Sequence, residues 1–170
     1  MGTGPTRSYE PVVRDAEVGD RDELVRLSTR ALGHLDDQRG GTLFRDVEAR
    51  PHPVHPTIDA DLLAAEAGTA HVLLGCLGPV PVGYAVSRVR SARGISIAVV
   101  EDLYVEPEAR GVGVGNALMV ALVERARSDG CDGIEAEALP GDRATKNFFE
   151  GFGLVTRKLT VHRVLDDGGD

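Results

Sequence analysis

Residues Arg110 to Gly115 read Arg-Gly-Val-Gly-Val-Gly, and this short run is the most informative part of the chain. It follows an apolar stretch, Ile95 to Val105, that predicts a strand, and it precedes Asn116 to Ser128, which predicts a helix. Glycines at alternate positions let the backbone approach a ligand closely, because they carry no Cβ atom. A strand that enters a helix through such a loop directs backbone N–H groups and the positive end of the helix dipole at one point. The sequence therefore predicts a pyrophosphate site at this junction.

Two common pyrophosphate motifs fail on their spacing. A dinucleotide fingerprint requires Gly-x-Gly-x-x-Gly, and its third glycine falls on Asn116 counted from Gly111 and on Leu118 counted from Gly113. A P-loop requires Gly-Lys followed by Ser or Thr, and no lysine of this chain follows a glycine. A turn that only caps a helix is the plainer interpretation, but it needs one glycine instead of three.

The segment resembles the coenzyme-A-binding motif of the GCN5-related N-acetyltransferases, the GNAT family. The resemblance is close from Val99 to about Ala126, and a weaker one runs from Ala138 to Leu154. It implies an α/β fold with a mixed, mostly antiparallel central sheet flanked by helices. It also implies acetyl-CoA as cosubstrate without a metal, and a primary amine of a small molecule or protein as acceptor, acetylated by direct attack in a ternary complex.

Composition sets limits on the class of protein. With 170 residues and 42% apolar content, the chain suits one domain, which we place at residues 10–165 between a flexible N-terminus, 1–9, and a flexible tail, 166–170. No apolar run is long enough to span a bilayer, and the polar N-terminus lacks a signal region, so we expect a cytoplasmic protein without a membrane partner. We expect Cys76 and Cys131 to be free thiols. The net charge of −8 argues against nucleic-acid binding and suits a cationic acceptor.

The predicted elements alternate in a way that matches the resemblance. Asp20 and Glu23 predict a capping box at the start of the first helix. From Gly33 to Pro56 the periodicity is lost, and the resemblance places part of the acceptor site there. His52 and His55 lie in this region without a third ligand, so we expect no metal site. We expect strands at Val12–Asp15, Ala70–Leu77, Val82–Arg90, Ile95–Val105, Gly133–Leu139 and Leu154–Leu165, and helices at Asp20–Leu35, Leu43–Ala49, Ile58–Ala67, Asn116–Ser128 and Arg143–Glu150.

The resemblance also assigns the site residues. In the family, the coenzyme's pantetheine arm lies between two central strands, here those with Leu103–Val105 and Gly133–Leu139. Glu101 is the candidate base, with Asp102 on the opposite face as a lesser one. The family's acidic tyrosine aligns with Phe149, which has no proton to donate, so Tyr104 or Tyr84 becomes the candidate acid. The positions expected to bind the coenzyme are Leu103, Tyr104, Val105, Arg110, Gly111, Val112, Gly113, Val114, Gly115, Asn116, Asn147 and Phe149.

Two functions stay open at this point. The first is an acetyl-CoA-dependent N-acetyltransferase, an acyltransferase that transfers groups other than aminoacyl groups. The second is an acyl-CoA-binding sensor or partner module with little catalysis, which Phe149 favours. Members of the family often dimerise, so a homodimer also stays open.

Overall fold

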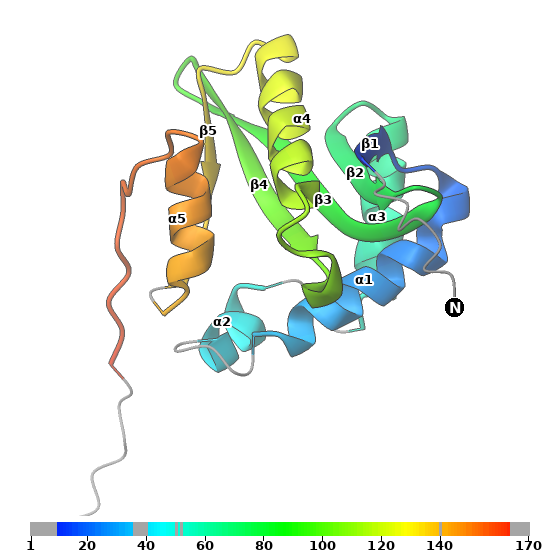
Figure 1. Cartoon of the computed structure of the whole chain (residues 1–170). Coiled ribbons are helices and arrows are strands. Elements are labelled where there is room, and N and C mark those ends of the chain that lie inside the picture. The colour runs from blue at the N-terminus through cyan, green and yellow to red at the C-terminus, as the bar shows by residue number, and fades with distance from the viewer. Residues whose placement is uncertain (1–9, 36–40, 50, 52, 140, 164–170) are drawn as a thin grey trace, which may run out of the picture.

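The computed structural model describes residues 10–35, 41–49, 51, 53–139 and 141–163, and it shows a five-stranded sheet in the order β1-β2-β3-β4-β5 (Figure 1). The first four strands pair antiparallel, and β4 and β5 pair parallel. This confirms the predicted mixed, mostly antiparallel sheet flanked by helices. The predicted flexible ends, 1–9 and 166–170, lie outside the described residues.

The elements follow the predicted order closely. The strands are β1 Pro11–Asp15, β2 Ala70–Leu77, β3 Val80–Ala92, β4 Ile95–Val105 and β5 Gly133–Ala136. The helices are α1 Arg21–Gly33, α2 Gly41–Val47, α3 His55–Glu66, α4 Val114–Ser128 and α5 Arg143–Gly151, with short 3-10 turns at Val18–Asp20 and Pro107–Ala109.

Each face of the sheet carries its own apolar core. On one face, Leu118, Met119 and Leu122 of α4 and Phe149 of α5 pack with buried residues of β2, β3 and β4. On the other, α1 and α3 supply Leu24, Leu27, Ile58 and Leu62, which pack with Tyr84 and Tyr104. Among the described residues, no helix has the length and apolar character needed to cross a membrane.

Two close contacts determine the positions of the start of α4 and the end of β4. A Cβ atom on Gly75 of β2 would lie 2.7 Å from Val114, the first residue of α4, so glycine lets the helix start lie directly on the sheet. Glu106, 8% exposed and just after β4, accepts from Arg26 and Arg30 of α1. The end of β4 is therefore tied to α1.

Some sequence predictions about the fold were wrong. The last strand, expected at Leu154–Leu165, is not present: residues 154–163 form no regular element, and 164–165 lie outside the described residues. As a result β5 is the edge strand. The parallel pair of β4 and β5 therefore lies at the edge of the sheet, whereas we expected it in the middle. The predicted capping box of Asp20 and Glu23 does not form, because the Asp20 carboxylate accepts from Arg14 and from the Glu17 N–H, in a capping box of the preceding 3-10 turn, while Glu23 pairs with Arg26.

Candidate active site

The glycine loop between β4 and α4 has a conformation that requires glycine. Gly111 has φ 80° and Gly113 has φ 96°, both in the left-handed region that residues with a Cβ atom rarely adopt. Gly113 is also the N-cap of α4. Val112 lies between them and is 53% exposed, so the loop lies at the surface. The loop therefore needs glycine at two positions, Gly111 and Gly113, whereas a turn that only caps a helix needs one.

The loop ends in a helix N-terminus that is suited to an anion. The N–H groups of Val114, Gly115 and Asn116 lie in the first turn of α4, where a helix offers them no acceptor of its own. The Nε atom of Arg110 donates to the Val105 carbonyl at 3.0 Å and ties the start of the loop to the end of β4. Free N–H groups and the helix dipole favour a pyrophosphate at this place, so the residues fit the predicted ligand.

An opening in the sheet leads away from the loop. The parallel pairing of β4 with β5 ends at Val100 and Ala136, whereas β4 continues to Val105. The backbone of residues 101–105 therefore faces no β5 partner along that edge. Leu103, Tyr104 and Val105, predicted to bind the coenzyme, lie on this stretch. Such an edge can pair with an extended, amide-rich chain as a strand would.

Glu101 occupies a β-bulge. Val86 of β3 pairs with Asp102, and the next residue, Ser87, pairs with Val100, so the register between β3 and β4 passes over Glu101. A bulge redirects side chains. Glu101 contacts Arg88 and Asp102 contacts Tyr84, two β3 residues an even number of positions apart. The two carboxylates therefore lie on the same face of the sheet, and our expectation of opposite faces was wrong.

Ion pairs and a hydrogen bond connect these two residues of β4 to β3, and one ion pair continues from β3 to α3. Arg88 donates to Glu101 with one nitrogen and to Asp61 of α3 with the other, at 2.6 Å from Asp61. Asp61 is 1% exposed, and a buried carboxylate needs such a partner. The Tyr84 hydroxyl donates to Asp102 at 2.8 Å. We call these five residues, Asp61, Tyr84, Arg88, Glu101 and Asp102, the carboxylate cluster.

Tyr104 lies nearer the loop than this cluster. It is 8% exposed, with its ring edge-on to His34 at 6.3 Å. Burial raises the pKa of its phenol above the ordinary value, with smaller opposing effects from Arg30 and Arg110. The hydroxyl therefore keeps its proton over the whole neutral range, as a proton donor must.

The two predicted residues of α5 have different surroundings. Phe149 is 8% exposed and belongs to the core under α4, whereas Asn147 is exposed. The neighbouring Phe148 lies 3.5 Å from the position that a Cβ atom on Gly115 would take, so α5 packs beside the first turn of α4. Asp142 caps α5 by accepting from the Thr145 N–H at 2.9 Å.

Other predicted features bear less on the site. Cys76 is a buried free thiol, and burial raises its pKa, while Cys131 is a half-buried free thiol. His55 begins α3 and is exposed, and His52 lies outside the described residues. Within the described part of the chain, no group of three metal-ligating side chains comes together.

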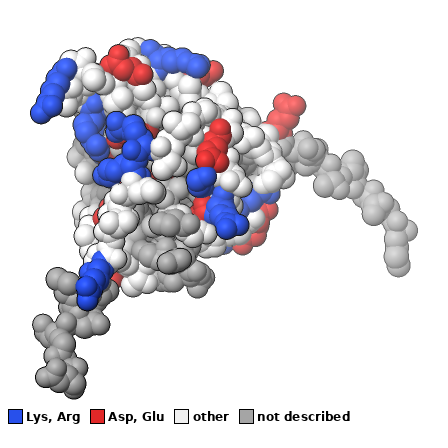
Figure 2. All heavy atoms as spheres, turned by 90° about the vertical axis from the view of Figure 1, so that its left-hand side faces the viewer, with Lys and Arg blue, Asp and Glu red and all other residues white. Residues whose placement is uncertain are grey.

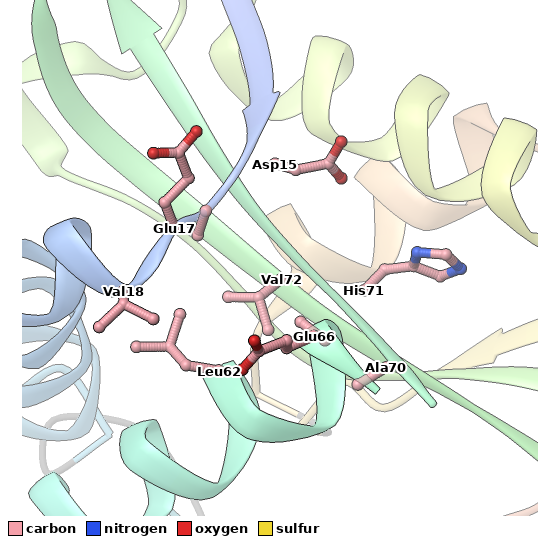
Figure 3. Close-up of a pocket in the computed structure, with 10 residues that line it drawn as sticks. Asp15, Glu17, Val18, Leu62, Glu66, Ala70, His71 and Val72 are labelled. Atoms are coloured by element: carbon pink, nitrogen blue, oxygen red, sulfur yellow. The ribbon is translucent and has the colours of Figure 1, made fainter. Parts of the chain in front are cut away.

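A cavity of about 330 Å³ lies between the end of β1, the start of β2 and α3. Val18, Leu62 and Val72 point toward one another there, while the carboxylates of Asp15 and Glu17 point away from them (Figure 3). None of the predicted site residues lines it.

Asp61 and Arg88 were not identified from the sequence. Each lies far along the chain from Glu101, and only the pairing of β3 with β4 and the packing of α3 bring them together. The available signal was an arginine in the strand before the one that carries Glu101. The sequence did not show whether that arginine was Arg88 or Arg90.

A mixed sheet whose fourth strand opens away from the fifth and enters a helix through a glycine loop is the architecture of an acetyltransferase. The model of the acetyltransferase (GNAT) family matches residues 39–154, and the chain belongs to that family. The prediction of family and enzyme class is confirmed.

Relatives agree with this assignment. A thialysine N-epsilon-acetyltransferase of Bos taurus is 24% identical over 149 residues, which cover 84% of this chain and 82% of the relative. An acetyltransferase structure from Trypanosoma brucei has a TM-score of 0.64 and 26% identity, covering 92% of this chain and 100% of the other. The structure of AAC(6')-Iy with the bisubstrate analog CoA-S-monomethyl-acetylneamine has a TM-score of 0.68 at 15% identity, covering 92% and 99%. At that identity the similarity shows the fold alone.

Proposed function

We propose that this chain transfers the acetyl group of acetyl-CoA to a primary amine of a small molecule or a protein, by direct attack in a ternary complex in the cytoplasm. The observation that carries the proposal is the layout of β4, which leads from two carboxylates at the bulge, past an open strand edge, to a glycine loop and the N-terminus of α4. Acetyl-CoA supplies the acetyl group as a thioester when bound.

The coenzyme is held mainly by backbone. The N–H groups from Gly111 to Asn116 bind its pyrophosphate, and Arg110 adds a guanidinium, which matches phosphate geometry. Leu103 to Val105 offer backbone groups along the open edge of β4. Asn147, exposed on α5, and Phe149 complete the predicted contacts. The CoA-containing ligand of the AAC(6')-Iy structure supports this choice of cosubstrate.

The acceptor is handled by the carboxylate cluster. A lysine-like amine has a pKa near ~10.4 and must lose a proton before it attacks. Glu101 takes that proton, directly or through water, and Arg88 fixes its carboxylate in place. Tyr104 donates a proton to the departing sulfur. One relative is named a thialysine N-epsilon-acetyltransferase, and AAC(6')-Iy is named an aminoglycoside N-acetyltransferase. Both names support an amine as the acceptor of this chain.

The alternative function is an acyl-CoA-binding module with little catalysis. It is favoured by Phe149, which lies in the apolar core and brings no hydroxyl to the site. The enzyme is favoured by the carboxylate cluster, because a module that only binds the coenzyme needs no base beside the open edge.

A turnover assay separates the two functions. Purified protein is given acetyl-CoA and a panel of amines: an amino acid with a side-chain amine, a polyamine, an aminoglycoside and a peptide with a free N-terminus. We expect thiol release that depends on one amine, with mass spectrometry showing that amine acetylated. Rates measured against both substrates should give intersecting reciprocal plots, the sign of a ternary complex. Tight coenzyme binding with no amine-dependent thiol release would instead establish the binding module.

A further inference from the structure

Asp61 is a carboxylate on the core-facing side of α3. It is 1% exposed, and its helix neighbours Ile58 and Leu62 are buried apolar residues of the core. Burying a carboxylate costs free energy, and even a well-paired one is often no more stabilising than a packed apolar side chain. Packing alone therefore does not explain a charge at this position of α3.

Arg88 connects Asp61 to the candidate base. One terminal nitrogen of the guanidinium donates to Asp61 at 2.6 Å, and the other donates to Glu101. The backbone of Arg88 pairs with Ala70 of β2 and Val99 of β4, so its Cα position is set by the sheet. The donors of a guanidinium form a rigid planar fork, so a contact at one nitrogen sets the direction of the other. Asp61 thereby orients the group that contacts Glu101.

The two contacts of Arg88 differ in their exposure to solvent. The side chain of Asp61 is 1% exposed, whereas that of Glu101 is 36% exposed. A buried pair is screened less by water and salt than an exposed one. Arg88 therefore stays on Asp61 when Glu101 turns to an incoming amine. Without the charge of Asp61, the fork could give both nitrogens to Glu101, and a carboxylate bound in that way has fewer lone pairs for a proton.

An ordinary surface ion pair is the plainer interpretation of such contacts. Figure 2 shows Lys and Arg side chains beside Asp and Glu side chains at several places on one face of the molecule, and exposed pairs contribute little to stability. Helix α3 carries one of this kind, Asp59 with Arg21, whose side chains are 47% and 37% exposed. Asp61 differs from Asp59 in its burial, so the plainer interpretation does not fit it.

We propose that Asp61 is a positioning residue for acetyl transfer, which holds the Glu101 carboxylate in its productive orientation through Arg88. The proposal rests on the proposed function, because it requires Glu101 to be the base. Asp61 moves no proton in this role. The proton of the amine goes to Glu101, and Asp61 acts on the rate only through Arg88 and Glu101.

A double-mutant cycle between Asp61 and Glu101 tests this proposal. The amine-dependent thiol-release assay compares wild type, Asp61→Asn, Glu101→Gln and the variant with both changes. Asp61→Asn keeps the shape of the side chain and removes its charge. We expect it to lower kcat by at least ~10-fold with KM for acetyl-CoA unchanged, because a misplaced base is inefficient. In the Glu101→Gln background it should lower kcat by less than about twofold, since no base is left to position.

A purely structural role of Asp61 gives a different result. It would lower kcat by the same factor in both backgrounds, and that result, or wild-type kcat in Asp61→Asn, would overturn the proposal. The matched control is Asp59→Asn, which removes the carboxylate of the exposed pair on the same helix and should keep kcat within about twofold of wild type. An equal loss in this control would also overturn the proposal. Wild-type kcat in Glu101→Gln would refute the base of the proposed function itself, so the two failures are distinguishable.

A second variant covers the case in which Asp61→Asn does not fold, as circular dichroism would show. Asp61→Asn combined with Arg88→Met removes both charges and leaves neither buried without its partner, a change that proteins tolerate better than the loss of one. The combined change should lower kcat by at least ~10-fold when Glu101 is present. It should lower kcat by less than about twofold in the Glu101→Gln background. Equal losses in the two backgrounds would overturn the proposal.

Discussion

The glycine loop and the carboxylate cluster adjoin the same strand, yet they are built differently. The loop depends on two backbone conformations within a few residues, at Gly111 and Gly113. The cluster depends on side chains from three elements, with Arg88 joined to residues 13 and 27 positions away. The comparison teaches that coenzyme binding is encoded locally and acceptor chemistry by tertiary packing. Substitutions in the two regions should therefore change different measured quantities.

The largest expected effect is on turnover in the cluster. Glu101→Gln keeps the shape of the side chain but removes the base, so turnover at neutral pH should fall by ~10²-fold or more while coenzyme affinity holds. The loss should shrink at high pH, where more of the amine is already neutral. Glu124→Gln, on an exposed position of α4, is the control. Wild-type turnover across the pH range would remove Glu101 from the mechanism and leave water as the proton acceptor.

The next effect is on stability. Arg88→Met leaves Asp61, 1% exposed, without its arginine partner, and should lower the free energy of unfolding by about 2–3 kcal/mol. The control is Arg90→Met, whose side chain is 70% exposed and 3.5 Å from Glu135. That change should stay within about 0.5 kcal/mol. Urea unfolding measures both, and equal losses in the two variants would show that the cluster does not depend on Arg88.

A smaller effect is expected at Tyr104, between the two regions. Removing its hydroxyl in Tyr104→Phe should lower turnover about tenfold, a modest loss because a thiolate already leaves fairly well. Since burial raises the pKa of this phenol, the acid form persists beyond the ordinary value of about 10, and wild-type activity should not fall on its account below that pH. Turnover of the variant equal to wild type at every pH would make Tyr104 a packing residue.

The sequence predicted most of the fold because local patterns specify most of it. The glycine spacing and the apolar run of β4 were sufficient to predict the loop between strand and helix. The turns between β2, β3 and β4 were sufficient to predict that these strands form consecutive hairpins. The bulge at Glu101 was not predicted, because it is a property of the pairing between β3 and β4. The strand predicted at Leu154–Leu165 was wrong for a different reason. Alternation indicates only that a segment can form a strand, and whether it does depends on pairing with another strand, which the segment's own sequence does not specify.

The central claim is that the loop from Gly111 to Asn116 binds the pyrophosphate of coenzyme A. A substitution at Gly113 would add backbone strain at φ 96°, so Val112, 53% exposed, is the better probe. Calorimetric titration of coenzyme A into Val112→Glu and Val112→Gln tests the claim, because the two side chains differ in charge and hardly in size. The account predicts affinity reduced at least tenfold in the glutamate variant, about 1.4 kcal/mol, with the glutamine variant near wild type. Equal affinities for the two folded variants would contradict it.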